Sequence, residues 1–476
     1  MKTFALKRAV CLILSLLILL SAASCGKASV SDDSNTLTDS QDTEQNETVI
    51  SANEISDKAI DAIIDTDFGG GDVIIATSND TTLLPDDTGN AVNRKRYERM
   101  NMLEEKFNFK FVKRKLTDAA IFTGARNAHN AELYYADLVY TAPTQLHRYK
   151  QTPIAANIAS LPFVTLDAPY FNKASMEQAS ADGMIYAAIG ESNMNADSLA
   201  GVFFNKDILS GLTGSDLYSE VYSQNWTLER MTELARLASY SDGKATGISG
   251  TATDLSVDNF IDNIYYSANG HNAYSSLDSI PVYTPFTQED QNCVDGIYEL
   301  MYNKSGFTRA NNARTRFAQG NSLFCVTSLS LKNEIADSDF DWGILPLPTY
   351  TAGNGYKTFR DNALPVTVVL SATPDLTRSG ILLEAVNAAS YGYVREAYFD
   401  ECMYEAVRDN DTLNMLDYII DGTGASFAYM FGAGINNLDD CTYLAARNVV
   451  KSTRKLEYYN RQGTKISELL TQNFDR

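Results

Sequence analysis

The sequence predicts an α/β protein made of two units, each built around its own sheet. Three observations predict this class. Short runs of β-branched and other apolar residues alternate along the chain with amphipathic stretches of helical period. The chain has 476 residues, which is enough for about two cores of ordinary size. A content of 44% hydrophobic and 21% charged residues is typical of globular proteins and excludes collagen-like, coiled-coil and wholly disordered classes.

The charge balance narrows the possible partners. The chain carries 60 Asp and Glu against 39 Lys and Arg, a formal net charge of −21. Such a surface repels phosphate backbones, so we expect no nucleic acid partner. With only three His and no HExxH or CxxC pattern, we also expect no metal site and no cofactor.

The first residues form an export signal. Lys2, Lys7 and Arg8 precede an apolar run over residues 9–20, and small residues follow before Cys25. This pattern predicts a signal peptide over residues 1–24 and resembles a bacterial lipobox, in which Cys25 is acylated and becomes the new N-terminus. The protein would then be exported and anchored by Cys25 to the outer face of the cell membrane. The alternative is ordinary secretion in which Cys25 has no role.

A polar segment follows the anchor. Residues 27–53 are dominated by Ser, Thr, Asp, Asn, Gln and Glu and contain hardly any large apolar side chains. Because such a segment cannot bury enough surface to offset its conformational entropy, we expect residues 25–71 to form a disordered tether. The folded part is expected to begin at Asp72.

The first half of the folded part predicts strands and helices in alternation. Apolar runs predict strands over residues 73–77, 109–112 and 136–140. Between the first two lies a predicted helix whose inward stripe contains Tyr97, Met100, Leu103 and Phe107. Strands separated by helices indicate a parallel sheet.

The same alternation resumes in the second half. Strands are predicted over residues 202–205, 322–327, 342–345 and 364–370. A helix is predicted over residues 228–240, with Thr227 as its N-cap and Trp226 packing on Met231 as a hydrophobic staple. Trp342 is expected in the core. The inward side of this helix is predicted to consist of Leu228, Met231, Leu234, Ala235 and Ala238.

The cysteines of the folded part suggest no framework of bridges. Cys293, Cys325, Cys402 and Cys441 are scattered through a domain large enough to hold a core without disulfides. Cys325 lies inside an apolar strand and is expected to be a buried thiol. We assign no disulfide bond.

Several segments together resemble a known family. They are residues 202–209 (VFFNKDIL), 225–231 (NWTLERM), 317–324 (FAQGNSLF) and 339–348 (DFDWGILPLP). In order and spacing they resemble the extracellular solute-binding proteins of ABC importers, the sugar-binding group that includes maltose-binding protein. Residues 380–389 and 408–420 resemble a subgroup common in Gram-positive anaerobes.

The resemblance implies a fold of the periplasmic-binding-protein type II kind. Two α/β lobes would be joined by hinge strands near residues 190–198 and 361–365, with a ligand cleft between them. Lobe one would comprise residues 72–192 plus 365–412, and lobe two residues 193–364 plus 413–476. The implied function is capture of a small solute, above all a sugar or oligosaccharide, for delivery to ABC permease subunits in the membrane. We expect a monomer without catalytic activity.

A sugar needs flat aromatic faces and paired hydrogen-bonding groups, and loops at the carboxyl ends of strands are the expected suppliers. The residues expected to bind ligand are Asn79, Asp80, Thr141, Asn193, Asn195, Thr327, Ser328, Phe359, Asp361, Asn362, Tyr429 and Phe431. Each has a structural alternative. The Asn and Asp residues could cap helices or form turns, and Tyr429 and Phe431 could belong to the core.

Two alternatives stay open. Where the family often places a stacking Trp, this chain has Thr327 and Ser328, so stacking must come from Tyr and Phe or the ligand is not a sugar. A surface-anchored glycan hydrolase would share the cellular location, the acidity and the aromatic content of this chain. It would also need two carboxylates flanking the scissile bond. No GxSxG, P-loop or Cys/His nucleophile pattern accompanies these features.

Overall fold

The structure is a computed structural model. It describes residues 51–63, 66–78, 83–85, 89–241, 244–268, 272–277, 279–303, 305–373, 375–402, 407, 409–435, 438–452 and 455–474. The predicted signal peptide, Cys25 and the tether up to residue 50 lie outside the described residues. So do Asn79 and Asp80.

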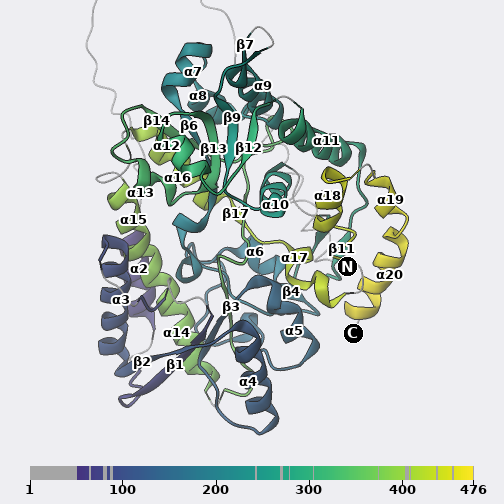
Figure 1. Ribbon diagram of the computed structural model, residues 1–476. Helices are drawn as coiled ribbons and strands as arrows, with labels where there is room; N and C mark the ends of the chain where they lie inside the picture. The colour runs from purple at the N-terminus through teal and green to yellow at the C-terminus, as the bar shows by residue number, and fades with distance from the viewer. Residues whose placement is uncertain are drawn as a thin grey trace, which may run out of the picture. The chain divides into compact units, whose positions relative to one another are not determined.

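One sheet gathers the strands of the first half (Figure 1). Its order is β16-β3-β1-β2, and its strands are β1 (Gly71–Thr77), β2 (Phe109–Lys115), β3 (Leu138–Thr141) and β16 (Val366–Val368). β1 runs parallel to β2 and β3, whereas β16 is antiparallel to β3. The predicted strands are therefore present, but the sheet is mixed rather than wholly parallel. Its edge strand β16 comes from a distant part of the chain.

A second sheet contains five strands in the order β12-β9-β13-β6-β14. They are β6 (Ala200–Asn205), β9 (Ser249–Thr253), β12 (Phe307–Arg309), β13 (Ser322–Ser328) and β14 (Trp342–Leu345). β6 is antiparallel to both of its neighbours, whereas β9 is parallel to β12 and β13.

The strand β9 is not predicted from the sequence because its residues, SGTAT, have no apolar pattern. Small residues are required there: a Cβ on Gly250 would lie 2.0 Å from the carbonyl oxygen of Ser305 and 2.3 Å from that of Ala235. The strand is thus defined by close backbone packing rather than by apolar side chains.

Two helices test the predicted inward stripes. In α9 (Leu228–Ser239) all five residues predicted to face inward are buried. Its N-cap is confirmed as well, because the Thr227 side chain accepts from the Arg230 N–H, and Trp226 and Met231 are both fully buried in one cluster.

The stripe predicted for α3 (Ala91–Phe107) is wrong at Tyr97, which is 47% exposed. Leu103 and Phe107 are buried as predicted, but Arg96 and Arg99 share their face. Arg99 can be buried because its guanidinium donates to the carbonyl oxygen of Leu83 and, at 2.8 Å, to Ser390 Oγ. The inward face of this helix thus combines apolar residues with buried cations, which an apolar pattern alone does not identify.

The expected tether is corrected over its last part. Residues 52–62 form α2 (Ala52–Ala62), capped by Ser51, and Gly71 already belongs to β1. α2 packs against α14 (Leu376–Ala389) and buries Ser56 and Ile60. The few apolar side chains of this polar segment lie on one face, so the helix finds a packing partner that composition alone does not predict.

The chain passes from the first sheet to the second through residues 190–199, and back through residues 360–365 (Figure 1). Neither passage is a strand, although hinge strands were predicted for both. The first consists of the 3₁₀ turns η3 (Glu191–Asn193) and η4 (Ala196–Ser198), and the second is a turn after β15 (Thr358–Phe359).

Two further passages link the parts of the chain that carry the two sheets. α14 continues through a π-helical turn, η5 (Ser390–Arg395), into α15 (Glu396–Glu401). After α16 (Asn410–Asp421), which packs on β14, the chain forms β17 (Thr423–Gly424), paired with β15.

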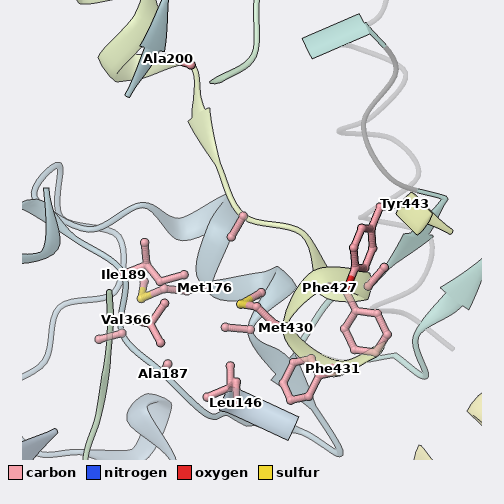
Figure 2. Close-up of a cluster of buried hydrophobic side chains, with 14 of the residues drawn as sticks. Leu146, Met176, Ala187, Ile189, Ala200, Val366, Phe427, Met430, Phe431 and Tyr443 are labelled. Carbon is pink, nitrogen blue, oxygen red and sulfur yellow. The ribbon is translucent and has the colours of Figure 1, made fainter. Parts of the chain in front are cut away.

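The segment after β17 departs from the predicted division of the chain. α17 (Phe427–Phe431) contacts η1 (Pro143–Gln145) and α5 (Leu146–Gln151), which follow β3. Figure 2 shows Phe431 beside Leu146 and Met430 near Met176 in one buried cluster. We had placed residues 413–476 wholly in lobe two, but α17 packs on elements of lobe one. Because three of its five side chains are large and apolar, this helix needs a buried partner.

The remaining elements complete the described part of the chain. The helices are α4 (Asp118–Asn130), α6 (Lys173–Gln178), α7 (Lys206–Leu212), α8 (Leu217–Tyr222), α10 (Val257–Ala268), α11 (Gln288–Tyr302), α12 (Ala313–Ala318), α13 (Leu331–Ile335), α18 (Tyr443–Val450), α19 (Glu457–Asn460) and α20 (Gly463–Phe474). Short strand pairs are β4 (Ser180–Ala181) with β5 (Met184–Ile185), β7 (Tyr240–Ser241) with β8 (Lys244–Ala245), and β10 (Ala273–Tyr274) with β11 (Val282–Tyr283). The four cysteines of the folded part are buried free thiols. Among the described helices, none has the length and apolar character needed to cross a membrane.

Candidate functional site

The polar groups at the end of β3 form hydrogen bonds within lobe one. Thr141 is fully buried, and its Oγ1 donates to Asp118 Oδ1 at 2.7 Å. The same carboxylate oxygen accepts from Ser78 Oγ at 2.8 Å and from the Ala142 N–H at 3.1 Å. Asp118 thus ties the ends of β1 and β3 to the start of α4. We had expected Thr141 to bind ligand, but its hydroxyl proton is used internally.

The corresponding end of β13 shows the same arrangement. Thr327 is buried, and its Oγ1 donates to Asp254 Oδ1 at 2.7 Å. Ser328 is half-buried, lies 2.8 Å from Ser330 Oγ and accepts from Arg314 at 3.2 Å. Thr327 is therefore a structural residue here, while Ser328 retains partial access to solvent.

The two asparagines of the first passage stabilise its turns. Asn193 is fully buried; its Nδ2 donates to Thr367 Oγ1 at 2.8 Å, and its Oδ1 accepts from the Gly190 N–H at 3.2 Å. Asn195 donates to Ser198 Oγ at 2.9 Å. Asn193 was predicted to bind ligand; in the structure both ends of its amide have an internal partner, and its role in binding stays a prediction.

Three of the predicted residues do come together. Phe359 and Tyr429 pack edge to face, with ring centroids 5.0 Å apart, and Tyr429 packs in the same way on Tyr443 at 5.4 Å. Asp361 follows Phe359 by two residues, and its charge adds to burial in raising the pKa of Tyr429. Phe359 is buried and forms the backing of this arrangement, whereas Asp361 and Tyr429 are half-buried. Phe431, the other predicted aromatic, belongs to the core that Figure 2 shows.

Three residues that were not predicted from the sequence complete the group: Tyr443, Arg447 and Asp262. Arg447 on α18 donates from Nε to Asp262 Oδ1 at 2.6 Å, and its Nη2 bonds the second oxygen of the same carboxylate on α10. We call Asp262, Phe359, Asp361, Tyr429, Tyr443 and Arg447 the tyrosine–aspartate cluster. A signal for it was available: Asp258 and Asp262, and likewise Tyr443 and Arg447, are four residues apart and so lie on one face of their helices.

The loop after β3 contacts the second passage, residues 360–365, beside the tyrosine–aspartate cluster. Asn362, which is exposed, accepts on Oδ1 from Thr144 Oγ1 at 3.0 Å and from the Thr144 N–H at 3.4 Å. The strand-end loop of lobe one is therefore in direct contact with the second passage, next to Asp361.

Burial dominates the electrostatics of the cluster. It raises the pKa of Asp361 above its usual value of 3.8, while the Ala363 N–H, at 2.8 Å from Oδ1, and Arg360 act in the opposite direction. The pKa of Tyr443 is raised to about 12, chiefly by burial, and that of Tyr429 is also raised. Both phenols are therefore neutral hydroxyl donors at neutral pH.

The arrangement suits a neutral polyhydroxylated ligand. Aromatic rings offer faces for apolar C–H groups, while phenols, carboxylates and a guanidinium donate and accept hydrogen bonds in pairs. Within the described part of the chain, no group of three or more His, Cys, Asp and Glu residues could hold a metal ion.

Comparisons with known proteins agree with this architecture. No family model matches the sequence, and no curated protein matches it. Among solved structures, the galacto-N-biose/lacto-N-biose I-binding protein of an ABC transporter from Bifidobacterium longum, in complex with lacto-N-biose, superposes with a TM-score of 0.54 at 14% identity. The match covers 86% of this chain and 99% of that one.

Two other structures give similar matches. The maltose-bound MalE3 of T. maritima has a TM-score of 0.51 at 12% identity, over 85% of this chain and 100% of that one. The GacH receptor of Streptomyces glaucescens, solved unliganded and with acarbose, has a TM-score of 0.50 at 13% identity. That match covers 85% of this chain and 99% of the receptor. At these identities the match concerns the fold. The chain has the two-lobe α/β fold of sugar-binding ABC-transporter substrate-binding proteins.

Proposed function

We propose that this protein is an exported substrate-binding protein of an ABC importer, which captures a sugar or oligosaccharide and delivers it to a membrane permease. The observation that supports this most is the tyrosine–aspartate cluster. Segments distant in sequence bring two tyrosines, two carboxylates and a guanidinium together beside a passage between the lobes. A ligand held there would contact both lobes, so that closure would bury it and reopening would release it.

The proposal includes a cellular location and partner proteins. Cys25 would carry the lipid anchor, residues 26–50 would be the flexible tether, and the permease subunits would receive the ligand from a monomeric carrier. The basic start, the apolar run and the small residues before Cys25 support the anchor. The lobe boundaries are proposed as residues 72–192 plus 365–412 and 193–364 plus 413–476, with α17 transferred to lobe one.

The first experiment is a thermal-shift screen against a library of mono- and oligosaccharides. A ligand that binds only the folded state raises the melting temperature by mass action, by an amount that grows with its concentration. We expect at least one saccharide to do so, and the shift to shrink in an Asp361→Ala, Tyr443→Ala variant. A library without any stabilising member would contradict the proposal.

The second experiment separates a carrier from a hydrolase. The stabilising oligosaccharide is incubated with an equimolar amount of protein and then recovered and analysed by mass spectrometry. A carrier returns it intact, whereas a glycan hydrolase, which uses two carboxylates on either side of the bond, converts it to shorter products. Appearance of such products, and their loss in Asp361→Asn, would favour the hydrolase.

A further inference from the structure

A hollow of about 490 Å³ lies beside α16, and none of its lining residues belongs to the tyrosine–aspartate cluster. Its lining includes Tyr222, Tyr356, Asn414, Asp417, Tyr418 and Asp421. Its size is within the range of ordinary small-molecule sites. Three aromatic side chains and three further polar side chains surround this one hollow, which is more than general surface polarity explains.

The three tyrosines form a fixed set of ring faces. The Tyr418 ring centroid lies 6.3 Å from that of Tyr222 and 6.3 Å from that of Tyr356. Tyr222 and Tyr418 are 43% and 39% exposed, whereas Tyr356 is nearly buried and its hydroxyl accepts from the Trp226 N–H at 3.2 Å. Single exposed tyrosines are normal on protein surfaces. Here two exposed rings and a buried one surround the same space.

Hydrogen bonds hold the exposed Tyr222 ring in place. Its hydroxyl donates to Asp411 at 2.7 Å and accepts from Asn414 Nδ2 at 3.0 Å. The guanidinium of Arg395 positions both Asp417 and Asp421. Its Nη2 lies 3.5 Å from Asp417 Oδ1 and 2.5 Å from Asp421 Oδ1. The ring faces and carboxylates are thus arranged before any ligand arrives, which reduces the entropic cost of binding.

A second hollow of about 410 Å³ adjoins the first, since Asp421 and Gly422 line both. Its lining also includes Gln178, Tyr266, Lys357 and Tyr274, which is 44% exposed. Gly422 is packed tightly at their common border, since a Cβ there would lie 2.7 Å from the carbonyl oxygens of Tyr356 and Tyr418. We call the two hollows together the outer groove.

We propose that the outer groove is a second saccharide-binding site, which takes an extended neutral oligosaccharide across Gly422. Tyr222 and Tyr418 stack on one end of the ligand and Tyr274 on the other, with the amide and carboxylate groups on its hydroxyl rim. Asp411, Asp417 and Asp421 outnumber Arg395 and Lys357 here, so anionic ligands are disfavoured. The proposal does not depend on what the tyrosine–aspartate cluster binds.

The test uses saturation-transfer NMR with maltohexaose, cellohexaose and xylohexaose as probes. The protein carries Asp361→Ala, so that binding at the tyrosine–aspartate cluster is weakened. We expect transfer to at least one probe, and weaker binding of that probe, by about 3- to 10-fold, after the further changes Tyr222→Ala and Tyr418→Ala, because each lost stacking contact contributes modestly. Asn414→Ala, on the exposed face of α16, should weaken it less and serves as a second variant if the tyrosine variant does not fold.

A matched control is available on α11. Tyr298 and Tyr302 are also exposed and close together, with ring centroids 4.9 Å apart and exposures of 44% and 51%. Neither lines the outer groove. Tyr298→Ala with Tyr302→Ala should leave transfer unchanged. The proposal is overturned if no probe receives transfer from the Asp361→Ala protein, if loss of Tyr222 and Tyr418 has no effect in a folded chain, or if the control pair weakens binding equally.

Discussion

Arg395 and Glu191 form an ion pair, with 3.0 Å between Nη1 and Oε1, that joins the helix α14–η5–α15 to the first passage between the sheets. The Glu191 side chain is only 12% exposed, and burial raises its pKa while the charge of Arg395 opposes that effect. Arg395 also binds Asp421 at the end of α16. One guanidinium therefore connects three segments that lie between the two sheets along the chain: η3, η5 and the end of α16.

Arg395→Ala should lower the free energy of unfolding by about 3–5 kcal/mol, because it leaves the Glu191 carboxylate buried without its partner. The measurement is urea denaturation followed by circular dichroism. Asp400→Ala, an exposed acid on α15, is the control and should change stability by less than about 0.5 kcal/mol. Equal denaturation midpoints for the two variants would show that the ion pair contributes little.

Asp361→Ala should weaken binding of the ligand found in the thermal screen by about 10- to 150-fold, the effect of losing one charged hydrogen-bonding group. Because Asp361 also accepts from the Ala363 N–H, Asp361→Ala should lower the melting temperature slightly. Asp361→Asn can keep that bond and should affect affinity more than stability. Calorimetric titration of both variants tests this, and unchanged affinity in both would remove Asp361 from the site.

The raised pKa of Asp361 predicts opposite pH dependences for binding and stability. The folded chain holds the Asp361 proton more tightly than the unfolded chain, so the contribution of Asp361 to stability falls as pH rises above 3.8 through the raised pKa. A ligand that needs the carboxylate as an acceptor instead binds less well as pH falls through the same range. Binding titrations and melting curves between pH 7 and pH 4 measure both trends. Asp361→Asn should remove the contribution of the Asp361 carboxyl to the pH dependence of affinity and of stability. Affinity that is equally pH-dependent in Asp361→Asn would assign the effect to another group.

Ile60→Ala should destabilise the protein by about 2–5 kcal/mol, because it removes the buried contact of α2 with the rest of the fold. A chain that begins at residue 66 should melt at a lower temperature than one that begins at residue 51, for the same reason. Lys58→Ala, with a side chain 62% exposed, is the matched control. If both truncated chains melt alike, α2 does not stabilise the fold.

Cys25→Ser should move the protein from the membrane fraction to the soluble fraction outside the membrane, because the acylated sulfur would be lost. Cys11→Ser, inside the apolar run of the same signal, should leave the protein in the membrane fraction. Immunoblots of the two fractions distinguish the variants. A Cys25→Ser protein that stays in the membrane fraction would exclude lipidation at this residue.

Local pattern predicted much of the fold. The runs that became β1, β13 and β14 are apolar enough to identify a buried strand without any partner, and the N-cap of α9 at Thr227 depends on residues within one helical turn. β9 could not be found in this way, because its small residues are selected by the backbones of Ala235 and Ser305, which approach from other parts of the chain.

The candidate site, like the fold, was predicted only in part from the sequence. Sequence by itself determined the acidity, the α/β class and the polar character of the strand ends, since each depends on composition or on neighbours along the chain; the export signal stays a prediction from the sequence. Tertiary structure alone decided that Thr141, Asn193 and Thr327 bond internally, and that Phe359, Asp361 and Tyr429 meet Tyr443 and Arg447. The physical reason is that internal partners use up part of the hydrogen-bonding capacity of a polar side chain, so the tertiary contacts decide what is left for a ligand. Those partners lie on elements far away in sequence, where no local periodicity reports them.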